Sequence, residues 1–153
     1  MLIREANLGD MEFLFKLRNE PEVRAASWSF AQVECVKHVD WFHSILEDPN
    51  RMLYIMEDNG VSVGQVRYDG REDNAEVNIS VSNLFYGNGY ASTGLKESAK
   101  IFFEKFPLVD IIFAHIKPDN AASVRAFEKA GYEHRGIVQY IGNECVEMTL
   151  SRP

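Results

Sequence analysis

The feature that most constrains this chain is the segment from residue 81 to residue 91, which joins a strand-like run to a helix-like run. It reads Val-Ser-Asn-Leu-Phe-Tyr-Gly-Asn-Gly-Tyr-Ala. Gly87 and Gly89 can take backbone angles that side chains forbid, so consecutive N–H groups of the loop can point at one anion. The helix that follows adds the positive end of its dipole. We therefore expect a strand, loop and helix arranged around a phosphate-bearing ligand.

Strand-like and helix-like patterns alternate along the rest of the chain in the order βααβββαβαββ. The patterns predict strands over 2–6, 52–57, 61–68, 76–81, 110–116, 132–141 and 144–150, and helices over 10–19, 35–48, 89–106 and 121–130. An antiparallel meander in the middle, followed by strand–helix–strand crossovers, indicates an α+β fold with a mixed sheet.

Turn and cap residues mark the ends of several of these elements. Pro21 is expected to stop the first helix, with a loop following it. Asn120 is expected to cap the helix over 121–130, and Gly131 to end it in the left-handed conformation. Gly142-Asn143 reads as the two-residue turn of a closing hairpin.

Length and composition favour a single domain covering residues 1–153, because 46% of the residues are hydrophobic and can form one core. A formal charge of −7 leaves no extended basic face, which argues against nucleic acid as a partner. No apolar run is long enough for a membrane span and no secretion signal precedes the domain, so a cytoplasmic protein is expected. Cys35 and Cys145 lack metal-type spacing; we expect two buried free thiols and no metal site.

Two common nucleotide-binding motifs do not fit the glycine loop. A dinucleotide-binding loop would have a third glycine at position 92, where Ser92 stands, and the Gly-Lys-Ser/Thr of a P-loop is absent. The loop instead resembles the signature Gln/Arg-x-x-Gly-x-Gly/Ala of the GNAT superfamily of acyl-coenzyme A-dependent acetyltransferases. A second stretch, running from Asn120 through Ser123 and Phe127 to Gly131-Tyr132, is similar to the second motif of that family.

The resemblance runs nearly end to end and implies a fold, a co-substrate and a binding loop. It implies a three-layer α/β/α arrangement with a mostly antiparallel sheet of about seven strands, in which the fourth and fifth strands splay apart at a bulge. It implies acetyl-CoA, with its pyrophosphate on the loop amides and its pantetheine arm along the fourth strand. The co-substrate-binding residues expected on this basis are Ile79, Val81, Tyr86, Gly87, Asn88, Gly89, Tyr90, Ala91, Asn120, Ser123 and Phe127.

The chain departs from the family pattern at three positions. Leu84 replaces the Gln/Arg of the signature and Tyr86 replaces a frequent Arg, so phosphate binding is expected to depend on backbone amides. Phe127 stands where many members have a Tyr that protonates the leaving thiolate, and a phenyl ring has no proton to give. The proton must come from another group or from water.

Glu76 is the first candidate for the catalytic base. Strand alternation places it with Asn78 and Ser80 on the face opposite the aliphatic residues, where these side chains could line an amine site. Partial burial would then raise its pKa toward neutrality. A solvated strand glutamate is the alternative. His115, expected near the splay, is the candidate for an alternative proton carrier, whereas His38, His43 and His134 are assigned structural or surface roles.

Three side chains are candidates for binding the acceptor, two of them with a structural alternative. Trp28, together with Phe30, lies in an aromatic stretch between the first two helices and forms either a core plug or a pocket wall. Arg18 is a cation near the end of the first helix. Arg67, with Tyr68, ends the third strand and either contacts an anionic substrate group or forms a surface pair.

The first 90 residues resemble the GNAT subgroup that acetylates nucleotide-linked amino sugars in pseudaminic-acid-type pathways. The resemblance rests on Arg18-Asn19-Glu20-Pro21, His38-x-x-Trp41-Phe42, Asp48-Pro49 and the stretch from Val63 to Asp69. The chain is similar, less closely, to members that acetylate protein N-terminal amines. A non-catalytic acyl-CoA sensor is the third possible function. We expect direct attack by a small-molecule amine in a ternary complex; the oligomeric state stays open, a homodimer included.

Overall fold

The computed structural model describes residues 1–29 and 31–153; Phe30, which was predicted to plug the core or line a pocket, lies outside the described residues. The strands are β1 (Leu2–Glu5), β2 (Arg51–Asp58), β3 (Val61–Gly70), β4 (Asn74–Val81), β5 (Ile111–Ile116), β6 (Glu133–Tyr140) and β7 (Asn143–Ser151). The helices are α1 (Met11–Arg18), α2 (Pro21–Ala26), α3 (Cys35–Glu47), α4 (Tyr90–Lys105) and α5 (Ala121–Lys129), with single 3-10 turns at Leu8–Asp10 and Asn83–Phe85.

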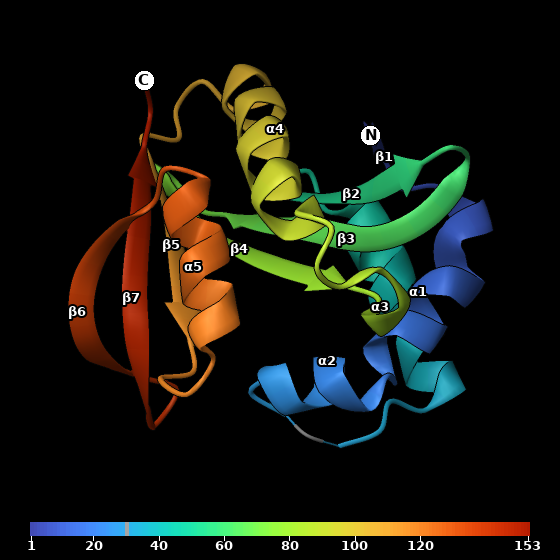
Figure 1. Cartoon of the computed structure of the whole chain (residues 1–153). Helices are drawn as coiled ribbons and strands as arrows, with labels where there is room; N and C mark the ends of the chain where they lie inside the picture. Colours follow the sequence, from blue (N-terminus) through green and yellow to red (C-terminus); the bar gives the residue numbers. More distant parts are fainter. Residues whose placement is uncertain (30) are drawn as a thin grey trace.

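These elements form three layers around one open sheet (Figure 1). The strand order is β1-β2-β3-β4-β5-β7-β6, and every neighbouring pair is antiparallel except β4 and β5. Helices α4 and α5 cover one face, and α1 and α3 cover part of the other (Figure 1). The predicted α+β fold with a mostly antiparallel sheet of about seven strands is confirmed.

Two clusters of buried side chains hold the layers together. The larger lies between the sheet and helices α4 and α5, where Tyr68 stacks on Phe102 with ring centroids 4.4 Å apart. The smaller packs Leu14 of α1 and Phe42 of α3 against Leu53 and Ile55 of β2. The buried strand residues of the smaller cluster come from β2, and farther along the same face the sheet carries Glu76, His115 and Glu147 beside Phe113 and Tyr140.

The sheet is weakly joined between β4 and β5. Their parallel ladder contains only three residue pairs, the last of which is Glu76 with Phe113. Beyond this pair the two strands separate, as the predicted splay requires. The predicted bulge is wrong, since β4 pairs with β3 without any shift of register from Ala75 to Val81. The divergence from β5 alone opens the sheet.

The structure corrects the sequence interpretation at two chain reversals. Pro21 does not lead into a loop but occupies the first turn of the short helix α2, where its missing N–H costs nothing. In the closing hairpin the two turn residues are Ile141 and Gly142, with φ of 50° and 72°, because Asn143 pairs with Tyr140 as part of β7. Two positive φ values are typical of a type I′ hairpin turn.

The predicted cap residues and one of the predicted buried thiols are in place. The side chain of Asn120 accepts a hydrogen bond from the N–H of Ser123, and Gly131 has a φ of 97°. Cys145 is buried, whereas Cys35 is exposed at the start of α3, so its predicted burial is wrong. Within the described residues, no helix has the length and apolarity to cross a bilayer.

Arg152 ties the end of the chain to the end of α4, and its loss should destabilise the fold. Its guanidinium donates to the carbonyl oxygens of Phe103, Phe106 and Val109. Replacement by Met should leave these acceptors unpaired and lower the free energy of unfolding by about 2 kcal/mol, which moves the melting temperature by roughly 4–8 °C. Urea unfolding measures the change.

The control Lys100→Met removes an exposed ion pair and should lower the free energy of unfolding by less than about 0.5 kcal/mol. Equal effects of the two variants would contradict the role given to Arg152.

Candidate active site

A cleft of about 690 Å³ opens where β4 and β5 separate. Its walls are the end of β4, the glycine loop with the start of α4, the first turns of α5, and one side of α2. The cleft therefore starts where β4 and β5 separate and ends at helix α2. The cleft is long and open, which suits an extended ligand lying across the sheet.

The glycine loop has the predicted backbone geometry. Gly87 and Gly89 have φ of 80° and 75°, and neither position has a protein atom within 4 Å of where a Cβ would lie. Asn88 closes the loop from inside, because its side-chain amide donates to the carbonyl oxygens of Phe85 and Tyr86. Gly89 is the N-cap of the sixteen-residue helix α4, so the first amides of that helix face the cleft.

The exposed edge of β4 supplies further backbone groups. The N–H of Ser82 donates to the carbonyl oxygen of Val63, so this residue pair belongs to the hydrogen-bonded set of the antiparallel ladder with β3. Hydrogen-bonded and non-hydrogen-bonded pairs alternate along such a ladder. The N–H and C=O groups of Ile79 and Val81 therefore point away from β3. They face the gap where β5 no longer pairs, and they are free to bond a ligand that lies there as an added strand.

A hydrogen-bonded network of ionisable side chains occupies the other face of the sheet, opposite α4 and α5. His115 lies between two carboxylates: its Nδ1 is 3.1 Å from Glu76 and its Nε2 is 3.0 Å from Glu147. The hydroxyl of Tyr140 donates to Glu76 at 2.6 Å, and its ring stacks on His115 at 4.0 Å. A neutral imidazole can donate from one nitrogen only, so two facing carboxylates require the protonated ring.

The pKa directions agree with this picture. Burial opposes charge on both groups, but the hydrogen bonds outweigh it: the pKa of Glu76 is lowered by His115 and Tyr140, and the pKa of His115 is raised by Glu76 and Glu147. The predicted rise in the pKa of Glu76 is therefore wrong. The stability that His115 contributes is present below its ordinary pKa and lost as pH rises through the raised value. The stability that Glu76 contributes is present above its ordinary pKa and is lost as the pH falls through its lowered pKa.

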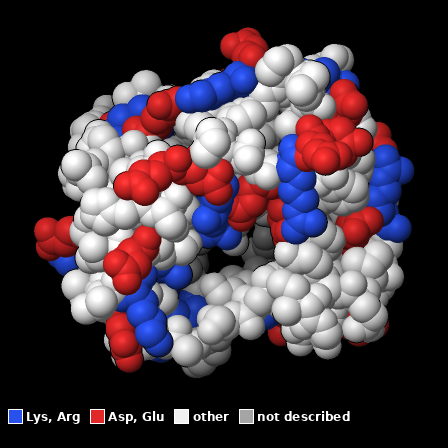
Figure 2. All heavy atoms as spheres, turned by 180° about the vertical axis from the view of Figure 1, so that it is seen from behind, with Lys and Arg blue, Asp and Glu red and all other residues white. Residues whose placement is uncertain are grey.

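Cationic groups gather beside this network, over β3. The guanidinium of Arg18 lies 4.0 Å from the ring centre of Trp41, and that of Arg67 lies 5.8 Å from the same ring. Arg67 is also paired with Asp69 at 3.2 Å, and Arg51 reaches the same carboxylate. Figure 2 shows this face hollowed near its centre, with basic and acidic side chains lying side by side around the hollow.

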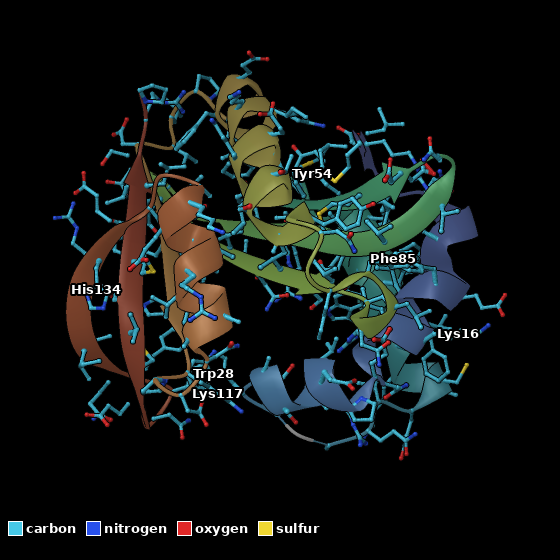
Figure 3. All side chains as sticks on the ribbon, in the orientation of Figure 1. Lys16, Trp28, Tyr54, Phe85, Lys117 and His134 are labelled. Atoms are coloured by element: carbon cyan, nitrogen blue, oxygen red, sulfur yellow. The ribbon has the colours of Figure 1, made fainter. Side chains whose placement is uncertain are left out.

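Trp28 connects the two faces of the site. Its ring lies 5.8 Å from Tyr140 and 6.0 Å from the ammonium of Lys117, which donates to the carbonyl oxygen of Ala25 in α2. Figure 3 shows Trp28 and Lys117 together near α2 and the end of β5. Both residues line a second hollow of about 380 Å³ beside the β6–β7 turn. Trp28 thus forms a pocket wall in this structure rather than a core plug.

The sequence matches the family model described as an acetyltransferase (GNAT) domain over residues 1–133, which is most of its length. The chain belongs to the GNAT acetyltransferase family. As a member it is an acetyl-CoA-dependent N-acetyltransferase. Comparison with the curated proteins finds no match.

Solved structures share the fold of this acetyltransferase across nearly the whole chain. An aminoglycoside acetyltransferase AAC(6′)-Ib in complex with paromomycin and acetyl-CoA is 20% identical, with a TM-score of 0.84 over 98% of this chain and 92% of that one. A spermidine N-acetyltransferase from Vibrio cholerae in complex with CoA and spermine is 18% identical, with a TM-score of 0.86 over 98% and 94%. A ribosomal-protein-alanine N-acetyltransferase from Brucella melitensis is 23% identical, with a TM-score of 0.84 over 99% and 100%.

The structure brings most of the sequence-predicted residues of the acetyltransferase together. The residues predicted to bind the co-substrate that line the cleft are Ile79, Val81, Tyr86, Gly87, Asn88, Gly89, Tyr90, Ala91, Asn120 and Ser123. Phe127 is instead buried in the core, edge-on to Tyr132 with ring centroids 4.9 Å apart, and supports α5 from behind. Tyr68 is also buried and bonds Ser98, so it cannot contact a substrate.

Sequence analysis missed several charged residues of the site. Lys117, Arg125 and Lys129 line the cleft, so the cleft contains cationic side chains besides the backbone amides of the glycine loop. Arg125 and Lys129 share the i, i+4 spacing of one face of α5, which could have indicated them. Tyr140 and Glu147 depend on the pairing of β5, β6 and β7 and carry no local signal. The described residues contain no group of side chains placed to hold a metal ion.

Proposed function

We propose that this acetyltransferase transfers the acetyl group to the primary amine of a nucleotide-linked amino sugar. The observation that carries the proposal is the charge distribution on the sheet face opposite α4 and α5, here called the acceptor face: Glu76 and Glu147 flank His115 in an acidic group, and Arg18 and Arg67 beside Trp41 form a basic one. An ammonium group suits the acidic group and a phosphate the basic one. A polyamine, which is cationic throughout, would bring positive charge against both arginines.

The residues of the chain divide the reaction between them. Acetyl-CoA supplies the activated acetyl group, and the backbone at Ile79 and Val81 with the glycine loop holds it against the split sheet. The ionised carboxylate of Glu76 attracts the ammonium form of the acceptor. Because its pKa is lowered, Glu76 is a weak proton acceptor, and the amine passes its proton on to solvent through the site. The neutral amine would then attack the thioester carbonyl directly, since neither cysteine has a paired base; the C–N bond forms, the C–S bond breaks, and the proton that the nitrogen loses reaches the leaving CoA thiolate through water.

An N-terminal α-amine of a protein is the second candidate acceptor. It is favoured by the full-length fold match to the ribosomal-protein-alanine N-acetyltransferase. A peptide would need room for a chain but no phosphate, so it would not use the two arginines in the same way. The two candidates therefore make different demands on Arg67.

A panel of acceptors with two arginine variants separates these functions. Release of free CoA thiol should be fastest with nucleotide-linked amino sugars, slower with free amino sugars and slowest with N-terminal peptides. Arg67→Ala should cut kcat/KM for the nucleotide-linked sugar by roughly tenfold or more, because a charged hydrogen bond contributes about 1.5–3 kcal/mol. Arg51→Ala, which removes the other arginine on Asp69, is the control.

The outcomes of the panel are distinct. Activity with peptides that survives Arg67→Ala, with none on sugars, would replace the proposed acceptor by the N-terminal amine. Binding of acetyl-CoA without thiol release on any amine would indicate an acyl-CoA sensor and would contradict the proposed enzyme activity.

A further inference from the structure

The environment of His38 has no role in the function proposed above. The side chain is buried in α3, with 1% of its surface exposed, and its ring contacts the rings of Phe15, Trp41 and Phe42. A histidine in an aromatic setting is usually a satisfied core residue. Here, however, one of its two ring nitrogens faces a residue of the acceptor site, Arg18.

The two partners of His38 determine its tautomer. Nε2 lies 3.1 Å from the carbonyl oxygen of Met11, which can only accept, so Nε2 carries the proton. Nδ1 lies 3.3 Å from Nη1 of Arg18, which can only donate, so Nδ1 must accept. The ring is therefore neutral. Burial and the charge of Arg18 lower the pKa of His38, in agreement with this assignment.

Arg18 is held at the acceptor face without a carboxylate of its own. Its contacts within the described residues are His38 on one side and the ring of Trp41 on the other, whereas Arg67 has Asp69. Burial and the nearby charge of Arg67 lower the pKa of Arg18 to about 10, so the guanidinium is still a cation at neutral pH. Two neighbouring cations, only one of them neutralised, form a site that an anion would stabilise.

We propose that His38 is a positioning residue which, as the neutral Nε2–H tautomer, holds the Arg18 guanidinium on Trp41, so that Arg18 and Arg67 form a subsite for an oxyanion of the acceptor. The inference rests on the proposed acceptor site and adds the residue that organises it. The ligand chemistry is that of a phosphate or a carboxylate group. Protonation of His38 at Nδ1 would place one N–H donor against another, so the Arg18 guanidinium would lose its hydrogen bond to the ring.

The first test needs no turnover. Imidazole nitrogen NMR of the native protein should show His38 protonated at Nε2 and bare at Nδ1 at neutral pH. With the cleft saturated by CoA, inorganic pyrophosphate and acetate serve as the phosphoryl and carboxylate probes in calorimetry. Binding of either identifies the source of the oxyanion, and tighter binding of pyrophosphate favours phosphate. A proton on Nδ1, or no heat with either probe, would overturn the proposal.

Two substitutions separate positioning from packing. His38→Asn can retain an acceptor near the Nδ1 position, whereas His38→Gln can retain only the donor toward Met11. Loss of the contact to Arg18 should raise the acceptor KM of His38→Gln roughly tenfold, with kcat within about twofold, while His38→Asn stays closer to the native KM. His43→Gln, an exposed histidine on the same helix, is the control. Equal effects of the two His38 variants on KM would indicate packing alone.

The pH dependence provides a further check. The titratable or charged groups that face His38 or its stacked partner Trp41 are Arg18 from α1 and Arg67 from β3, and both stay cationic through neutral pH. As pH falls through the lowered pKa of His38, acceptor KM and the Kd for the bound probe should both rise. In His38→Asn this acidic rise should vanish. If no amine is acetylated, the proposed function fails, yet the tautomer and the anion binding still decide this proposal.

Discussion

Replacing Gly89 with Asp is expected to weaken CoA binding by roughly a hundredfold. Asp tolerates the left-handed φ of this position better than most residues, and no protein atom blocks its Cβ. Its carboxylate would then stand in the loop proposed to hold the diphosphate, and two like charges about 5 Å apart repel by about 3 kcal/mol at an effective dielectric constant of about 20. Isothermal titration calorimetry with CoA measures the change in Kd.

Two controls separate the charge from the backbone strain. Gly89→Asn has the same shape without the charge and should lose far less affinity. Gly60→Asp tests the same strain elsewhere, since Gly60 has a φ of 78°, an open environment and a place in the β2–β3 turn. It should bind CoA normally. Equal Kd values for Gly89→Asp and the native protein would show that the loop does not hold the diphosphate.

Glu76→Gln is expected to lower kcat/KM for the amine by roughly ten- to a hundredfold, because it breaks the charged hydrogen bonds that hold His115 and Tyr140 in the site, each contributing about 1.5–3 kcal/mol. The amide would also remove the charge that attracts the ammonium group. CoA affinity should not change, because Glu76 lies on the opposite face from the cleft loop. Steady-state kinetics with thiol detection measure the loss. The exposed carboxylate of Glu133 supplies the control, Glu133→Gln.

The variant Glu76→Gln should also lower the pKa of His115. Glu76 is one of two carboxylates that raise the pKa of His115, so its neutralisation should bring that pKa down toward the ordinary histidine value. The stability conferred by the imidazolium would then be lost at a lower pH than in the native protein. NMR titration of His115 measures the shift. Unchanged turnover together with an unchanged pH profile would remove Glu76 from the mechanism.

The backbone geometry of the glycine loop could be predicted because its signals are local. Two glycines at fixed spacing, a strand before them and a helix after them lie within about a dozen residues. The same holds for Asn120, whose capping of α5 depends only on the residues three positions away. Short-range backbone chemistry decides such features, and the sequence displays it directly.

Features were not predictable in the same way where one residue suits two local structures or where the structure depends on partners distant in the sequence. Pro21 ends one helix and is equally suited to begin the next, and only the packing of α2 beside the cleft decides between them. In the closing hairpin, the faces of β6 and β7 place Ile141 at a positive φ that its side chain disfavours. The register of the two strands outweighs that local cost.

The acceptor face shows the same limit more strongly. Glu76 and His115 were both identified as candidates, but their contact depends on β4 lying beside β5, and Glu147 enters only through the pairing of β5 with β7. Burial alone, which the sequence does suggest, would raise the pKa of Glu76. The two hydrogen-bond donors that reverse the shift lie 39 and 64 residues away in the sequence.

The three-pair seam between β4 and β5 has a consequence for how long the folded protein survives. A ligand that spans the seam binds the native state and not the unfolded chain, so it stabilises the fold by mass action, by about 2.7 kcal/mol at a hundred times its Kd. The melting temperature of the protein should therefore rise with the concentration of a co-substrate that spans the seam.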